Sequence, residues 1–360
     1  MATSIEAPIY MAIHPGSILR EELMERGISQ KTFAKKIGMQ PSHLSEIIKG
    51  KRPITKSVAD KLEEVLGIPS LDWVNLQIKY DYDSSQSKER QIVEMASREE
   101  LLAYDKLVDV KLLTSRLGFN SSLCSKILSF IKESFSLPEP ARLQVQSDGL
   151  FKKSAKVGKD PRMIMTWMLL AKHYANSCAV EADYVESCLD ELVPKISSIL
   201  HSNTKTIETL TRTFADYGII FGVVNKVDGA SIDGYSFVCK GHPCIIVTRR
   251  FDRIDNLAFA VMHELGHIKN HDNEGRCVNL DDYDHESLEE KTANSFAANA
   301  LIPDALWRKI PEVQLCPTKI QRLYTTWAEK NGYNKWIALG RISHETGMYK
   351  FKNDSSRRIS

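Results

Sequence analysis

The sequence lacks several features that would place it in a special class of protein. Its seven cysteines form no C-x-x-C pair, and a scattered, odd count predicts free thiols rather than a disulfide framework. No apolar run approaches the roughly 20 residues that span a bilayer, and no basic-then-apolar signal segment opens the chain. The formal net charge is only +2, so any DNA contact must come from a local patch. We therefore expect a cytoplasmic protein with no membrane partner.

The length and composition indicate a globular chain with more than one core. At 360 residues, the chain is long enough for two or three domains. A hydrophobic content of 42% supports those cores, and a charged content of 26% is usual for globular surfaces. Helical patterns dominate, with a few short strand patterns near residues 218–247. The predicted fold class is mainly α with a small β-sheet (α+β).

One pentapeptide carries a recognisable metal chemistry. His263 and His267 are four residues apart with Glu264 between them, in an apolar run without proline that predicts a helix capped by Asp252 or Asp255. On a helix both imidazoles lie on one face, where they can share one zinc ion. Glu264 is then placed to act on a zinc-bound water as a catalytic base rather than as a ligand. Gly266 is unfavourable inside a helix, which suggests that a neighbouring helix or the metal site needs room there.

A second predicted helix, from about residue 287 to residue 301, offers a third ligand. Glu290 follows His267 far enough along the chain for a loop and a return, and small residues share its face. Two histidines and one carboxylate with an open position form the catalytic arrangement of zinc. The alternative is a capping box, in which Glu290 pairs with Ser287. The fallback ligands are Glu289, Glu286 and His285.

These segments resemble a known family. HELGH (263–267), EKTANSFA (290–297) and LIP (301–303) resemble the ImmA/IrrE-type metallopeptidases. GIIFGVV (218–224), GYSF (234–237) and PCIIV (243–247) resemble that family's first strand and the hairpin before its active helix. The resemblance covers about residues 205–345. It implies a zincin-like peptidase fold with His263, His267 and Glu290 as metal ligands and one Zn2+ per chain, although such a ligand set also binds iron or manganese.

The N-terminal region, over residues 14–80, predicts five short helices separated by glycine turns, which is the helix-turn-helix pattern. The expected helices run from Pro15 to about Arg26, over residues 30–37, from about residue 41 to before Gly50, and over residues 55–66 and 70–77. Polar side chains at helix starts suit phosphates and base edges, and a basic turn suits phosphates. An ordinary helical bundle with a solvated basic turn is the alternative. The candidate DNA contacts are Gln30, Gln40, Ser42, His43, Lys49, Lys51 and Arg52.

The same region resembles a family of DNA-binding proteins. HPGSIL (14–19), LSEIIKGKRPIT (44–55) and WVNLQ (73–77) resemble the HigA-type antitoxins of the Xre helix-turn-helix class, over about residues 12–82. The resemblance implies a five-helix, lambda-repressor-like domain whose third helix enters the major groove and adds Ser45 to the contacts. It also implies a homodimer on a palindromic operator.

Between the two regions the chain reads as a helical connector that could hold a sensor. The predicted domains are therefore 12–82, 83–203 and 204–350, with a polar linker over residues 81–88. We expect an apolar helix to begin at Pro161, and its stripe of apolar side chains predicts that it packs in a hydrophobic core. The basic run within residues 144–160 predicts a solvated loop rather than a DNA site. We expect residues 353–360 to be frayed.

Three interpretations follow. The chain is a DNA-binding regulator whose zinc endopeptidase cleaves a repressor or toxin partner, an antitoxin-like autorepressor whose peptidase fold is a non-cleaving sensor or partner-binding module, or a metal-bound transcription factor without a toxin. Glu264 favours the first, because a purely structural zinc site does not need that carboxylate. The strand at residues 244–248, if it lies at a sheet edge, could align a peptide by strand addition. Candidates for a second oxyanion donor are His285, His271 and Tyr283.

Overall fold

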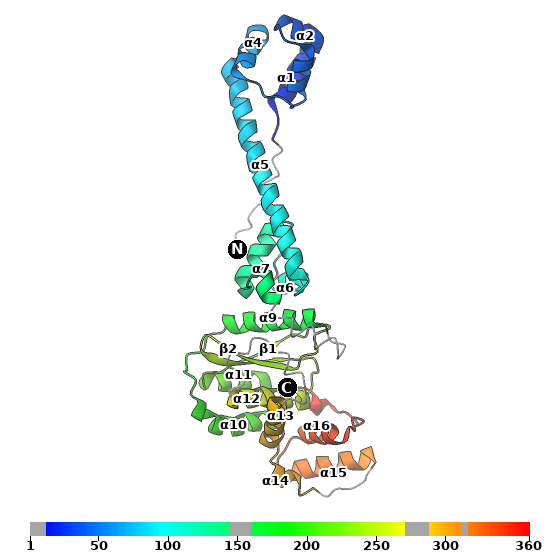
Figure 1. Cartoon of the computed structure of the whole chain (residues 1–360). Helices are drawn as coiled ribbons and strands as arrows, with labels where there is room; N and C mark the ends of the chain where they lie inside the picture. The colour runs from blue at the N-terminus through cyan, green and yellow to red at the C-terminus, as the bar shows by residue number, and fades with distance from the viewer. Residues whose placement is uncertain (1–11, 145–159, 271–287, 311–315) are drawn as a thin grey trace. The chain divides into compact units, whose positions relative to one another are not determined.

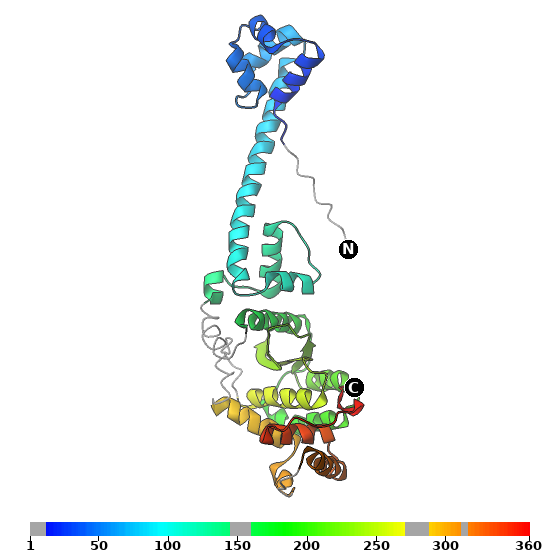
Figure 2. The ribbon, with the colours of Figure 1, turned by 90° about the vertical axis from the view of Figure 1, so that its right-hand side faces the viewer.

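The computed structural model describes residues 12–144, 160–270, 288–310 and 316–360. Contacts divide the chain into two compact units, Met1–Arg98 and Glu99–Ser360. Helices dominate both, and the second unit contains a three-stranded sheet (Figures 1 and 2), so the expected mainly α fold with a small sheet is confirmed. Among the described residues, no helix is both long and apolar enough to cross a membrane. The three predicted domains stay a prediction.

The N-terminal unit contains the five expected helices, which are α1 (Pro15–Glu25), α2 (Gln30–Lys36), α3 (Pro41–Ile48), α4 (Lys56–Leu66) and the start of α5 (Ser70–Asp105). Side chains cap three of them, because His14, Ser29 and Thr55 each accept a hydrogen bond from a first-turn backbone N–H. Their apolar faces enclose one core. Its fully buried members include Leu19, Phe33, Leu44, Ile47, Leu62 and Trp73.

The predicted linker over residues 81–88 is wrong, because α5 is one continuous helix from Ser70 to Asp105. No glycine or proline occurs between these residues. The serines of the polar stretch each cost only a few tenths of a kcal/mol in a helix, which is too little to end it. The basic run expected within residues 144–160 lies almost wholly outside the described residues.

The sheet of the second unit has the strand order β1 (Ile220–Val224), β3 (His242–Thr248), β2 (Gly234–Cys239). β3 runs parallel to β1, with Ile220 opposite Cys244, and antiparallel to β2, with Gly234 opposite Val247. β3 is therefore the central strand, so the condition stated for strand addition at residues 244–248, a place at the sheet edge, is not met. Among the described strands, β1 and β2 form the edges.

Side chains alternate between two cores on the two faces of this sheet. Ile220, Cys244 and Ile246 pack on one face with α6 (Val110–Arg116), α7 (Cys124–Phe135) and α9 (Pro161–Ser177). Phe221, Ile245 and Val247 pack on the other with α10 (Leu189–Ser202), α11 (Thr206–Asp216) and α12 (Ile254–Lys269). Figures 1 and 2 show the sheet between α9 and α12. The apolar stripe of α9 is core, as expected, with Trp167 almost fully buried.

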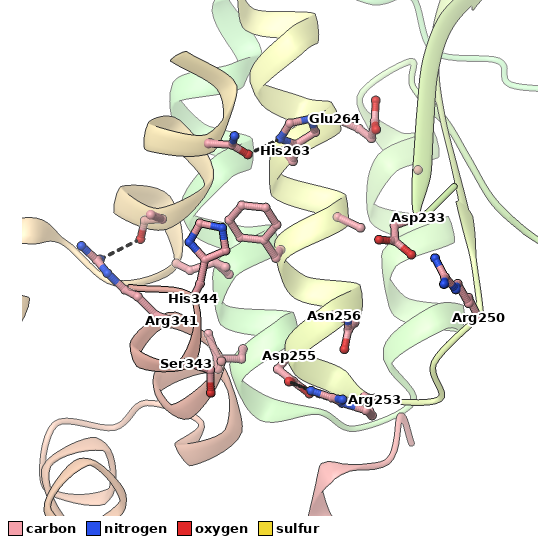
Figure 3. Close-up of a pocket in the computed structure, with 18 of the residues that line it drawn as sticks. Asp233, Arg250, Arg253, Asp255, Asn256, His263, Glu264, Arg341, Ser343 and His344 are labelled. Carbon is pink, nitrogen blue, oxygen red and sulfur yellow. Dashed lines mark hydrogen bonds and ion pairs between the residues drawn. The ribbon is translucent and has the colours of Figure 1, made fainter. Parts of the chain in front are cut away.

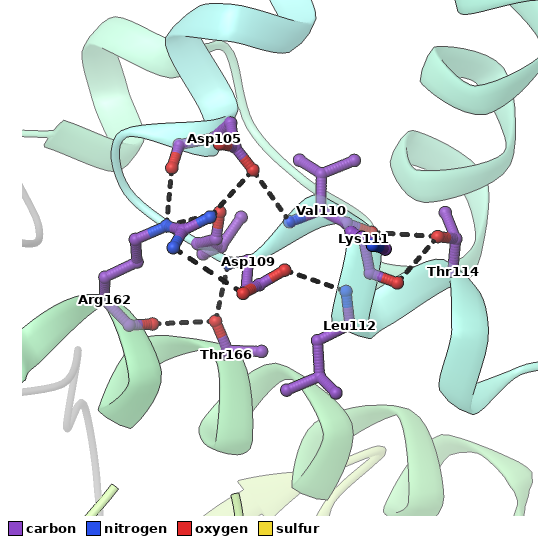
Figure 4. Close-up of polar contacts among 9 residues, drawn as sticks. Asp105, Asp109, Val110, Lys111, Leu112, Thr114, Arg162 and Thr166 are labelled. Atoms are coloured by element: carbon purple, nitrogen blue, oxygen red, sulfur yellow. Dashed lines mark hydrogen bonds and ion pairs between the residues drawn. The ribbon is translucent and has the colours of Figure 1, made fainter. Parts of the chain in front are cut away.

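Arg162 joins the end of α5 to α9 within the second unit (Figure 4). Its Nε donates to the Asp105 carbonyl oxygen at 2.6 Å, and its Nη2 lies 2.9 Å from the Asp105 carboxylate. The backbone N–H of Asp109 donates to Thr166 Oγ1, whose hydroxyl in turn donates to the Arg162 carbonyl oxygen. These bonds hold the turn after α5 against the first turns of α9.

The C-terminal part adds α13 (Leu288–Leu301), the short α14 (Asp304–Trp307), α15 (Pro317–Lys330), α16 (Lys335–Thr346) and a 3-10 turn at Ser355–Arg357. Another 3-10 turn, Glu186–Cys188, directly precedes α10. The expected fraying of residues 353–360 is wrong. Arg357 donates to both carboxylate oxygens of Asp255, at 3.1 and 2.8 Å, and Trp336 Nε1 donates to Asp354 and Ser356. The terminal segment is therefore bonded to α12 and α16.

Candidate metal centre and nucleic-acid interface

Helix α12 presents the HELGH segment as the sequence predicts. The helix spans Ile254–Lys269, and most of its residues are buried between the sheet, α13 and α16. The predicted cap is wrong, because Arg253 occupies the N-cap position and no side chain caps the helix. Asp252 instead pairs with Arg249, and Asp255 pairs with Arg253 and Arg357.

His263, His267 and Glu290 meet at one point between α12 and α13. The two Nε2 atoms lie 3.0 Å apart, and the Glu290 carboxylate oxygens lie 3.2 Å from His263 Nε2 and 3.3 Å from His267 Nε2. Ligands in a tetrahedron around zinc at about 2.1 Å are separated by about 3.4 Å. The two nitrogens, and each nitrogen with its nearest carboxylate oxygen, are separated by nearly that distance, and the three residues form a group able to hold a metal ion. The residues present therefore fit a divalent cation.

The charges of the three groups support this arrangement. Burial opposes the charge on Glu290, but hydrogen bonds from both histidines and their positive charge outweigh it and lower the pKa of its carboxyl to about 2. Burial also opposes the charge on His263, yet the hydrogen bond to Glu290 and the carboxylates of Glu264 and Glu290 raise its pKa. An anionic carboxylate therefore faces two imidazole nitrogens in a buried site.

Asn294 and Gly266 set the position of these ligands. His263 Nδ1 lies 3.0 Å from Asn294 Oδ1, so a proton on Nδ1 donates to the amide and leaves Nε2 free as a ligand. A Cβ on Gly266 would lie 3.2 Å from Ala293 Cα and 3.0 Å from the Phe296 ring. Glycine therefore lets α13 approach α12 closely, which is the reason anticipated for Gly266. Sequence analysis missed the role of Asn294, whose only signal is its place one turn after Glu290.

Glu264 points from α12 towards the start of β2. The side chain is buried, and a Cβ on Gly234 would lie 2.8 Å from its Cγ and its Oε1. The backbone of the edge strand β2 thus lies directly against the carboxylate. Sequence analysis missed Gly234, because its contact with Glu264 joins distant parts of the sequence and depends on how the sheet packs on α12.

These residues open into one cavity of about 630 Å3. Figure 3 shows it between α12, α13, α16 and the start of β2. Phe259 stacks between His263 and His344, with ring centroids 6.0 and 6.2 Å apart, so His344 of α16 is a polar group that sequence reasoning missed. The three expected second donors, His285, His271 and Tyr283, lie outside the described residues, as do the fallback ligands Glu286 and His285.

The candidate DNA contacts gather around α2 and α3. Leu44, Ile47 and Ile48 bury one face of α3, which leaves the other face to polar side chains. Arg52 pairs with Glu46, which offsets part of its charge. Exposed are Gln30, Gln40, Ser42, Lys49, Lys51 and Arg52, while His43 and Ser45 are partly buried.

Two curated relatives are similar to about a fifth of this chain. Virulence-associated protein I of Dichelobacter nodosus is 37% identical over 82 residues, which cover 22% of this chain and 76% of that protein. The uncharacterised HTH-type transcriptional regulator YddM of Escherichia coli is 39% identical over 69 residues, or 19% of this chain and 73% of that protein.

Two solved structures of antitoxins are similar to part of this chain. An addiction module antidote protein of the HigA family from Coxiella burnetii is 32% identical, with 24% of this chain and 95% of that chain covered and a TM-score of 0.22. The Pseudomonas aeruginosa antitoxin HigA with the higBA promoter is 29% identical, with 24% and 94% covered and a TM-score of 0.22.

Two family matches cover separate parts of the chain. Residues 19–73 match the family described as helix-turn-helix, and residues 222–332 match the IrrE N-terminal-like domain of the peptidase family M78. The second range contains β2, β3 and the end of β1, together with the HELGH helix and Glu290. The chain therefore belongs to the Xre-type helix-turn-helix proteins and carries an ImmA/IrrE-like peptidase domain in its C-terminal unit.

Proposed function

We propose that this chain is a sequence-specific DNA-binding transcriptional regulator whose C-terminal unit is a metal-dependent endopeptidase acting on a repressor or toxin partner. The observation that carries the proposal is the convergence of His263, His267 and Glu290 to within 4.8 Å, with the Glu264 carboxylate beside them in one cavity. We expect zinc, one ion per chain, because two histidines and a carboxylate leave one position open for chemistry.

Each residue of the site has a separate role in the proposed peptide hydrolysis. A divalent cation held by the three ligands would polarise a peptide carbonyl and make water more acidic. Glu264 Oε1 would accept a proton from the attacking water and later deliver it to the leaving amine. Asn294 keeps Nδ1 of His263 protonated, which leaves its Nε2 for the cation. His344 is positioned across Phe259 to donate to a substrate carbonyl farther along the cavity.

The edge strand β2 supplies a surface for an extended peptide. Among the strands that the structure describes, β2 pairs with β3 alone, and its first residue, Gly234, lines the cavity beside Glu264. A peptide that adds to this edge would bring a backbone carbonyl next to the ligand cluster. This geometry favours an unfolded or extended segment of a protein over a folded surface as the substrate.

The N-terminal unit supports binding to double-stranded DNA. Its match to helix-turn-helix proteins and the exposed polar face of α3 favour Ser42 and Lys49 as residues that meet a major groove. We expect a palindromic operator bound by a homodimer. Lys51 and Arg52, in the turn after α3, would contact phosphates rather than bases.

The first experiment measures metal content. Wild type, Glu290→Ala and Glu264→Gln are purified without affinity-resin metals, and bound metal is counted by elemental mass spectrometry. We expect about one zinc per chain in the wild type and in Glu264→Gln, and loss in Glu290→Ala. Metal at equal levels in wild type and Glu290→Ala would contradict the ligand assignment.

Cleavage is then tested on a proteome-derived peptide library, with new N-termini read by mass spectrometry. We expect cuts by the wild type and none by Glu264→Gln. Cuts that persist in Glu264→Gln would contradict the role of that carboxylate. Bound metal without any cleavage, tested with intact toxin-like partners as well, would leave the antitoxin-like autorepressor with a non-cleaving module as the function.

A further inference from the structure

Three of the described arginines line the cavity that contains the ligand cluster, and two of them are paired with carboxylates. Arg253 Nε lies 3.2 Å from the Asp255 carboxylate, and Arg341 Nη2 lies 2.6 Å from the Asp304 carboxylate. In the part of the chain that the structure describes, Arg250 has no carboxylate within ion-pair distance. An unpaired guanidinium in a substrate cavity is a candidate contact for an anionic group of the substrate.

Arg250 is held in place by contacts at the end of β3. Its backbone N–H donates to Thr248 Oγ1 at 2.9 Å, and the Thr248 N–H donates to the Asp233 carbonyl oxygen at 3.0 Å. The guanidinium carbon lies 5.0 Å from the centroid of the Phe251 ring. A guanidinium over an aromatic ring keeps the N–H groups at its edge free to donate. These contacts therefore present a carboxylate-binding group beside the start of β2.

The unpaired arginine lies at the end of the cavity away from the metal ligands. Figure 3 shows Arg250 and Asp233 across from Asn256, in the first half of α12, whereas His263 and Glu264 lie in its second half. We call the end lined by Asp233, Arg250 and Asn256 the distal subsite. Asn256 precedes His263 by seven residues, which is about 10 Å of helix at about 1.5 Å per residue. An extended peptide covers that distance with about three residues.

Asp233 carries the opposite charge in the distal subsite and moderates its preference for anions. Its side chain is exposed, and no ion pair joins it to Arg250. A substrate carboxylate would therefore be attracted by Arg250 and repelled by Asp233. Ion pairs that water can reach contribute little, so an acidic side chain should be preferred by about twofold to fivefold.

We propose that the distal subsite selects substrates that carry an aspartate or glutamate about three residues from the cut bond. The inference rests on the proposed peptidase function and names a class of substrate for it. The substrate carboxylate would accept N–H groups of Arg250, while the peptide backbone pairs with the edge of β2. Extended acidic segments of a protein partner are thus preferred over neutral or basic ones.

The test is cleavage of the proteome-derived peptide library, with the residues that flank each cut counted by position. Wild type is compared with Arg250→Glu and with Arg249→Glu, a control that makes the same charge change in the same loop but outside the cavity. We expect acidic residues to be enriched about twofold to fivefold at one position about three residues from the cut, in the wild type and in the control. In Arg250→Glu, lysine and arginine should be enriched there instead. Acidic enrichment that persists in Arg250→Glu, or cuts without enrichment in the wild type, would overturn the proposal.

A binding measurement separates this inference from the proposed cleavage. The same library is passed over the immobilised Glu264→Gln chain, which should bind peptides without cutting them, and the bound peptides are identified by mass spectrometry. Adding Arg250→Glu should lower the acidic content of the bound peptides, and adding Arg249→Glu should not. A wild type that cuts nothing would contradict the peptidase function alone. An equal acidic content in the two double variants, or no bound peptide, would overturn the distal subsite.

Discussion

Gly266→Ala probes how closely the two ligand-bearing helices must approach. The new Cβ would lie 3.0 Å from Phe296 Cδ1 and 3.2 Å from Ala293 Cα. The helices would have to separate by roughly 0.5 Å to restore an ordinary carbon–carbon contact of about 3.7 Å. Glu290 lies one turn before Ala293 on the same helix, so its carboxylate would move with α13.

This displacement is large for a metal site. Metal–ligand distances in a working site hold within about 0.2 Å, so we expect zinc affinity to fall roughly tenfold to a hundredfold. Overpacking costs about 1–3 kcal/mol, while alanine gains about 1 kcal/mol of helix propensity over glycine. The net loss of unfolding free energy is thus at most about 2 kcal/mol. A large loss of affinity should accompany a small loss of stability.

The assay is competition for zinc between the full chain and a chromophoric chelator, with urea unfolding measured in excess chelator. Gly340→Ala is the matched control, because its Cβ would lie 2.9 Å from Asp255 Cβ on the same helix α12. Asp255 lies about 12 Å along the helix from His263 at about 1.5 Å per residue. The control should lose stability and keep its zinc affinity. Unchanged affinity in Gly266→Ala, or an equal loss in both variants, would refute the reasoning.

Three further changes test the surroundings of the site. Gly234→Ala should displace the Glu264 carboxylate, since its Cβ would lie 2.8 Å from Oε1, so library cleavage should slow up to about a hundredfold while metal content stays unchanged. Asn294→Ala removes the acceptor 3.0 Å from His263 Nδ1 and should weaken zinc binding about tenfold in the chelator assay, with no loss if the amide has no orienting role. Burial lowers the pKa of His201, which holds it neutral in the folded chain, so the free energy of unfolding should fall as pH drops below about 6.5, where the unfolded chain gains the proton. Urea titrations at pH 7.5 and 5.5 should show a smaller fall in His201→Gln, and equal falls would contradict this assignment.

Local chemistry made much of the site predictable. The spacing of His263 and His267 needs only a helix to bring both rings to one face. Glu290 could be predicted as the third ligand because small residues on its helix indicated close packing against a neighbouring helix. Gly266 indicated where along the first helix that packing occurs. The caps at Ser29 and Thr55 and the glycine turns between helices likewise depend on a few neighbouring residues.

The wrong sequence predictions concern features that are set by contacts between residues distant in sequence or by weak helix preferences. β3 lies at the centre of the sheet because β1, which precedes the β2–β3 hairpin in the sequence, joins it in parallel, and no turn signal records this pairing. The serines after Asp81 disfavour a helix only weakly. The flanking residues, which continue the helix without a glycine or proline, therefore decide the structure there. The C-terminal segment is ordered by Arg357, whose partner Asp255 lies 102 residues away in sequence. The strand order and the terminal segment thus depend on pairing between distant residues, and the helix after Asp81 depends on its neighbours along the chain.

The two-sided sheet sets a limit on how this chain can be divided for expression. The IrrE-like match begins at residue 222, after α9, so a recombinant fragment that starts near residue 204 would look complete by sequence. Such a fragment would expose to water the sheet face that carries Ile220, Cys244 and Ile246, which α9 covers in the full chain. We expect it to aggregate, whereas a fragment that begins before Pro161 retains its cover. The region before the peptidase-like domain thus covers one of the two faces of that domain's sheet.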